Sequence, residues 1–212
     1  MTNKAGNSSL FFDAINKFIY RFLSFLFRPI YNVNSFFMAV GKQLAWIALA
    51  MMVIVILLGV FFRYVLNDPL PWPDEAARFF MLWMTALVAP SAFRFGGFVS
   101  IDTLARALPR RLSAALNIII LTISAVVLYH GIQIGWKHTM GFGGNFESSS
   151  LKIPLSFIGL ETFKMKLRYM YGSLLVATFL LFLVAIELIL KSALNFLNPS
   201  TTIDDIGSMD LK

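Results

Sequence analysis

Few ionisable side chains lie inside the apolar stretches of this chain, and a charged group placed in hydrocarbon is costly and often functional. His130 lies in one such stretch, and the only other histidine, His138, follows eight residues later. On a helix this spacing separates them by about 12 Å, too far for both to ligate one haem iron. We therefore expect His130 to bond to a neighbouring helix or carbonyl; a proton or quinone role is the alternative.

Glu187 and Lys191 are spaced i,i+4 near the end of another apolar stretch, which favours an ion pair at the membrane surface. No Ser/His/Asp constellation, phosphate-binding loop or metal-spaced cluster stands out in the sequence. The chain has 0 Cys, which excludes disulfides and thiolate metal sites. The sequence therefore predicts no catalytic residue, no metal and no cofactor, and indicates that the chain is not an enzyme.

A group of charges marks the expected start of a helix near residue 73. Pro73 suits the first helical position, where its missing N–H costs nothing. Asp74 and Glu75 follow at the positive end of the helix dipole. Arg78 comes four residues after Asp74 and three after Glu75, so we expect these charges to neutralise each other.

Aromatic and charged residues flank this helix start. Tyr64, Trp72 and Trp83 suit either the aromatic belt of a membrane or a protein interface. The helix is followed by Arg94-Phe-Gly-Gly-Phe-Val-Ser-Ile-Asp102. These residues have two interpretations. They either anchor the start of a helix at the membrane surface or form an interface with another subunit.

The hydrophobic composition of the chain predicts that membrane helices position most of these residues. Of the 212 residues, 58% are hydrophobic and 14% are charged, with a net charge of +7; soluble domains carry roughly 25% charged residues. The basic residues sit singly at the ends of apolar runs, which argues against a nucleic-acid surface. A membrane helix needs about 20 apolar residues. Four runs qualify, giving expected spans at about 42–63, 73–95, 111–136 and 168–191.

An amphipathic stretch precedes the spans. Between residues 10 and 29, the basic residues Lys17, Arg21 and Arg28 fall on one helical stripe in a segment rich in Phe, Ile and Leu. Such a helix is expected to lie in the headgroup plane, and Pro29 to end or kink it. We interpret the segment as part of the mature protein, because it has no small-residue cleavage site.

These elements together predict an all-α integral membrane protein. Residues 1–34 form the tail and interfacial helix, 35–197 the four-helix transmembrane domain, and 198–212 a disordered polar tail. A second interfacial helix is expected at 100–108, and the Gly- and Ser-rich residues 137–168 are expected to form the largest exposed loop. Four spans place successive connecting segments on alternate sides of the membrane. The segments on the side of the termini carry eleven Lys and Arg residues, and those on the other side carry seven. This excess predicts that both termini are cytoplasmic.

The ordered motifs resemble the small, Q-type (DctQ-like) membrane subunit of TRAP transporters, the tripartite ATP-independent periplasmic carriers. The resemblance is good over residues 41–108 and looser over the remaining helices. The residues that carry it are Arg63, Tyr64, Trp72, Glu75, Arg78, Trp83, Arg94 and Asp102. One departure is Phe98, because such subunits often have a histidine shortly before the Ile-Asp pair.

The resemblance implies a scaffold in the bacterial inner membrane. In that family a large M-type subunit holds the substrate and sodium sites and moves as an elevator, and a periplasmic binding protein delivers an organic acid, often a carboxylate or sialic acid. The small subunit would brace the large one and contact membrane lipids. Ala45, Ala48 and Gly59 would let a partner helix approach the first span closely.

Two other functions compete with this one. A small membrane subunit of an oxidoreductase could use His130 toward a quinone or a haem shared with a partner, and a Soret band would reveal it. A self-contained tetraspan channel could line a pore in an oligomer with Asn117, Thr122 and Ser124. Flux through liposomes that contain this chain alone would support the channel.

Overall fold

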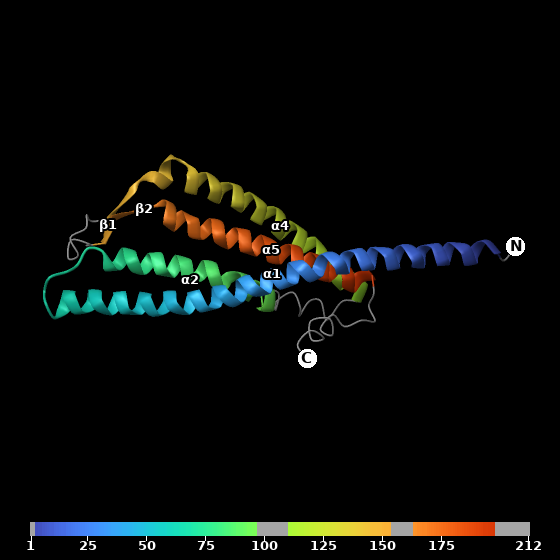
Figure 1. The fold of residues 1–212 in the computed structure, drawn as a ribbon, viewed down its shortest axis with the longest axis horizontal. Coiled ribbons are helices and arrows are strands. Elements are labelled where there is room, and N and C mark those ends of the chain that lie inside the picture. Colours follow the sequence, from blue (N-terminus) through green and yellow to red (C-terminus); the bar gives the residue numbers. More distant parts are fainter. Residues whose placement is uncertain (1–2, 97–109, 154–162, 198–212) are drawn as a thin grey trace. The chain divides into compact units, whose positions relative to one another are not determined.

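In the part of the chain that the structure describes, four long helices accompany a small two-stranded sheet (Figure 1). The computed structural model describes residues 3–96, 110–153 and 163–197. The long helices are α1 (Asn3–Tyr64), α2 (Pro73–Gly96), α4 (Arg110–Met140) and α5 (Arg168–Leu197). Each contains a segment long and apolar enough to cross a membrane. The prediction of an all-α membrane protein with four spans is confirmed.

Helix α1 continues through Pro29, so the expected separate interfacial helix is not found. Proline removes one intrahelical hydrogen bond, to the carbonyl of Phe25, but the 62-residue helix does not end there. At about 1.5 Å per residue α1 is about 90 Å long, three times the hydrocarbon thickness. The predicted boundary between residues 34 and 35 therefore falls inside a helix, and much of α1 must lie outside the hydrocarbon.

The turn between α1 and α2 follows the expected chemistry. Helix α1 ends with the Asp68 amide bonded to the Phe62 carbonyl at 3.1 Å, and Asn67 adopts the left-handed conformation (φ 53°) that asparagine tolerates. Helix α2 begins at Pro73 as predicted, and the Ala76 amide bonds to the Trp72 carbonyl at 3.0 Å. In Figure 1 this turn joins the two helices at one end.

The described parts of the expected loop at 137–168 form regular secondary structure. Helix α4 extends to Met140 and is followed by a 3-10 turn, η1 (Phe142–Asn145). Strands β1 (Glu147–Ile153) and β2 (Phe163–Lys166) then pair antiparallel, with Glu147 opposite Lys166 and Ile153 opposite Phe163. The register shifts between Glu147 and Lys152. The expected helix at 100–108 and the tail at 198–212 lie outside the described residues.

The chain divides into two compact units. One comprises residues 1–35, 96–125 and 183–212, and among its described residues Phe27 and Leu194 form a small core with Leu23, Tyr31 and Leu190. The other comprises residues 36–95 and 126–182. Its core is built on Val55 and Ala76, with Trp72, Phe80 and Met165 packed around them.

Small residues on α1 serve contacts within the chain. Ala45 and Ala48 are buried, and a Cβ placed on Gly59 would lie 3.0 Å from the Cβ of Pro73. Ala45 and Ala48 are thus covered within the chain itself, and Gly59 permits a close approach between α1 and the start of α2. The prediction that a partner helix packs on this face of α1 stays a prediction.

Candidate functional site

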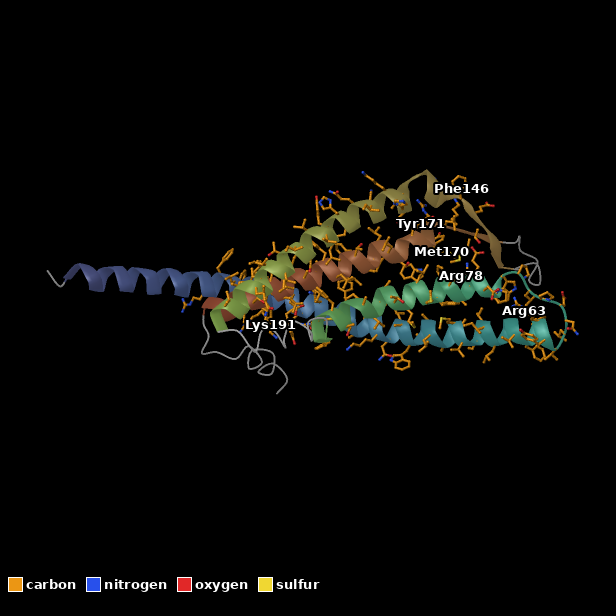
Figure 2. The ribbon with its side chains drawn as sticks, turned by 180° about the vertical axis from the view of Figure 1, so that it is seen from behind. Arg63, Arg78, Phe146, Met170, Tyr171 and Lys191 are labelled. Atoms are coloured by element: carbon orange, nitrogen blue, oxygen red, sulfur yellow. The ribbon has the colours of Figure 1, made fainter. Side chains whose placement is uncertain are left out.

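The charged residues at the start of α2 pair differently from what their spacing predicts. Arg63 Nη2 lies 3.5 Å from Asp74 Oδ2, with the two side chains 54% and 78% exposed. Such an exposed pair contributes little to stability. Arg78 is exposed and forms no ion pair within the described parts of the chain, so its expected neutralisation by Asp74 or Glu75 is not seen. Figure 2 labels Arg63 on α1 and Arg78 on α2.

Glu75 instead connects α2 to the sheet. The Ser148 hydroxyl, on β1, donates a hydrogen bond of 2.6 Å to Glu75 Oε1. Ser148 is buried and Glu75 is half-buried, so water competes little for this contact. Seventy-three residues separate the two, and the bond fixes the sheet against the first turn of α2.

An apolar cluster lies under this hydrogen bond. Trp72 and Phe80 pack with Val55 of α1, Ala76 of α2 and Met165 of β2. Trp72 is half-buried, which agrees with a structural role for its ring in this cluster. The motif residue thus helps to join α1, α2 and the sheet through burial of apolar surface.

Trp83 connects α2 to the beginning of α5. Its indole Nε1 donates to the carbonyl of Tyr169 at 3.1 Å. The ring also lies 6.3 Å from that of Phe79, tilted by 54°. Trp83 is half-buried, so its ring packs between the helices while its N–H is satisfied by a carbonyl.

The remaining predicted residues do not join this group of contacts. Tyr64 is 72% exposed at the end of α1. Arg94 is half-buried, and its guanidinium carbon lies 5.7 Å from the centre of the Phe95 ring. Arg21 and Arg28 are exposed on α1, which also carries Lys17. Asp102 and Phe98 lie outside the described residues.

The two histidines, both on α4, make only local contacts among the interactions described. His130 is exposed on α4, with its ring 6.0 Å from that of Tyr129. The hydrogen bond to a carbonyl that we expected for His130 belongs to His138, whose Nδ1 lies 2.9 Å from the Ile134 oxygen. Among residues 3–96, 110–153 and 163–197, no group of three or more His, Cys, Asp or Glu is placed to hold a metal.

A buried polar contact between α1 and α5 was not predicted from the sequence. Glu187 was expected at the membrane surface, whereas the structure leaves only 2% of this residue exposed. Asn34, 3% exposed, donates from Nδ2 to Glu187 Oε2 at 2.8 Å and to the Leu183 carbonyl at 3.2 Å. The available signal was Asn34 itself, a polar residue between the apolar stretches of α1.

The site therefore consists of polar anchors that join α2 to the sheet and to α5. Comparison with known proteins agrees with this description: a family model, the DctQ component of the tripartite ATP-independent periplasmic transporters, matches residues 52–195. No curated protein and no solved structure gives a match. The matched residues make up about two-thirds of the chain and contain the whole of the site built around α2. The chain thus belongs to the DctQ family and is the small, multi-pass inner-membrane component of a TRAP transporter.

Proposed function

We propose that this chain is an accessory scaffold that braces the large, M-type subunit of its transporter. The observation that carries the proposal is how little of each span is buried within the chain. In the most apolar stretch of the four helices only 17%, 22%, 6% and 22% of residues are buried. Surfaces of this extent must be covered by lipid or by another membrane protein.

The transported solute is proposed to be bound by the large subunit. A sodium-coupled importer of an organic acid, such as a carboxylate or sialic acid, needs polar groups at the depth of the membrane. Within the described spans of this chain, the buried carboxylate of Glu187 is already bonded to Asn34. This bond supports an accessory role for the chain in transport, in which the large subunit binds the substrate and sodium.

The β1–β2 sheet and the turn after α1 are proposed to face the periplasm and to contact the binding protein. The excess of Lys and Arg on the side of the termini supports cytoplasmic termini. The turn after α1 and the β1–β2 sheet then lie outside the inner membrane. The basic stripe of Lys17, Arg21 and Arg28 is proposed to contact anionic lipid headgroups.

Affinity purification in mild detergent tests the scaffold. We expect a larger polytopic protein to be recovered with the chain in constant ratio, and transport in liposomes to require both chains together with a binding protein. Recovery of the chain alone, or flux through liposomes that contain only this chain, would contradict the proposal. A Soret band in the purified chain would instead favour the oxidoreductase alternative.

A further inference from the structure

An apolar groove lies between helices of the unit formed by residues 36–95 and 126–182. Its volume is about 650 Å³. Residues from α1, α2, α4 and α5 line it, and the indole N–H of Trp136 is the one polar group that their side chains carry: Phe37, Val40, Gly41, Leu44, Leu87, Ile132, Trp136, Leu175, Val176, Phe179 and Leu180. A groove of this volume with so few hydrogen-bonding groups is a poor place for water.

The groove is lined by helices that are long and apolar enough to cross a membrane. All its lining residues from α1, α2, α4 and α5 fall within the candidate membrane spans of these helices. Gly41 brings α1 close to α2, because a Cβ at this position would lie 3.1 Å from the Leu87 carbonyl oxygen. Trp136 and Phe179 are about half exposed, at 57% and 48%. An apolar chain could therefore enter from the lipid and contact aromatic rings at the edge.

Two basic side chains meet beside this groove. Lys42 directly follows Gly41, and its Nζ lies 5.2 Å from the centre of the Phe95 ring. The Arg94 guanidinium lies 5.7 Å from the same ring. Arg94 follows Leu87 by seven residues, two helical turns and about 10 Å, on the same face of α2. Arg94 thus lies two turns beyond the groove-lining Leu87 on α2, and Lys42 lies next to the groove-lining Gly41 on α1.

We propose that the groove and these two cations form a binding site for an anionic phospholipid. An acyl chain occupies the groove, and the phosphate is held by Lys42 and Arg94 over the Phe95 ring. Among the described residues Lys42 forms no ion pair, and it is exposed, so its ammonium group is available to a phosphate. Basic pockets between membrane helices are a known mode of recognition for anionic headgroups. This site goes beyond the proposed scaffold function and does not depend on it.

Native mass spectrometry of the full-length chain tests the site. The purified chain, alone and together with its membrane partner, is titrated with phosphatidylglycerol or phosphatidylcholine. We expect one phosphatidylglycerol to bind more tightly than phosphatidylcholine, and Lys42→Gln to weaken phosphatidylglycerol binding about five-fold. Lys166→Gln, which removes an exposed charge on β2, is the matched control and should leave binding unchanged. Val40→Trp should fill the groove and weaken both lipids.

Three results would overturn the site. Equal binding of the two lipids by the unmodified chain would show that the anionic headgroup is not recognised. This result does not depend on any variant folding correctly. If Lys42→Gln and Lys166→Gln weakened binding equally, the binding would depend on the net charge of the protein and not on a site at Lys42. Loss of the bound lipid in the presence of the membrane partner would show that a helix of the partner occupies the groove.

Discussion

Asn34 and Glu187 form a hydrogen bond of 2.8 Å between helices whose contacting residues lie 153 positions apart in the chain. Both side chains are more than 95% buried. In an apolar setting a polar group is costly unless a partner satisfies it, so this bond favours one rotation of α1 against α5 over its alternatives. The neighbouring contact of Phe27 with Leu194 supplies apolar area to the same unit but has little directional preference.

Substitution of Asn34 by Leu should destabilise the chain, because the buried carboxylate of Glu187 loses a donor. The expected loss is about 1–2 kcal/mol, measured as a lower unfolding temperature in detergent. Asn32→Leu is the matched control, since Asn32 is exposed on the same helix. Equal unfolding temperatures for the two variants would show that the Asn34 bond contributes nothing measurable.

The hydrogen bond from Ser148 to Glu75 should appear as coupling between the two positions. We expect Ser148→Ala and Glu75→Ala to destabilise the chain singly, and a double-mutant cycle to give a coupling free energy of about 1.5 kcal/mol. Glu75→Ala should also lower the recovery of the complex with the large subunit. Asp74→Ala breaks only the exposed pair with Arg63 and should cost less than about 1 kcal/mol. Additive effects at positions 75 and 148 would refute the tether.

Trp83→Phe should loosen the contact between α2 and α5. The substitution keeps an aromatic ring but removes the donor to the Tyr169 carbonyl, at a cost of about 1 kcal/mol. Hydrogen exchange at the first turn of α5 should increase as a result. Trp46→Phe is the control, because Trp46 is 69% exposed on α1. If exchange in α5 were the same in both variants, the indole bond would have no role in holding this turn.

Alanine should have opposite effects at two glycines. At Gly144 an added Cβ would lie 2.5 Å from the Thr139 carbonyl oxygen, so the turn after α4 must shift and the chain is destabilised. At Gly172, in α5, nothing lies within 4 Å of the added Cβ, and alanine should stabilise the helix by about 0.5–1 kcal/mol. Thermal unfolding of the two variants measures the difference. Shifts of the same sign would contradict the close packing of this turn.

Reversal of Lys17, Arg21 and Arg28 to Glu should weaken binding of this part of α1 to anionic membranes. The expected loss is about 1 kcal/mol per basic residue, measured as the salt-dependent protection of residues 10–29 from protease in phosphatidylglycerol-containing liposomes. The charge-conserving substitutions Lys17→Arg, Arg21→Lys and Arg28→Lys should leave the protection unchanged. Normal protection and normal transport in the Glu variant would make the basic stripe dispensable.

The spans could be predicted from the sequence because hydrocarbon thickness imposes a minimum length that hydropathy detects directly. The start of α2 was predictable too, since Pro73 marks a first helical position. The continuity of α1 was not predictable, because tertiary and membrane context can override the local cost of Pro29. The pairing of Glu75 with Ser148, and not with Arg78, depends on a sheet whose formation joins distant residues.

The Asn34–Glu187 contact escaped prediction for a similar reason. Spacing along one helix identifies i,i+4 pairs such as Glu187 with Lys191, but it carries no information about which side chain arrives from another helix. Asn34 lies outside the four apolar runs, and only the extension of α1 shows that it belongs to the same helix as the first span. The partner of a buried carboxylate is thus set by the three-dimensional arrangement.

The bond from Trp83 to Tyr169 constrains the order of events during biosynthesis. Its acceptor is translated 86 residues after its donor, a delay of about 4–17 s at ordinary rates of chain elongation. Once α2 is complete at Gly96, α1 and α2 are available for membrane insertion, while the anchor of α2 to the sheet awaits Ser148 and its anchor to α5 awaits Tyr169. The first helical hairpin must therefore persist in the bilayer as an incompletely packed intermediate, and it becomes locked only when the last span has entered.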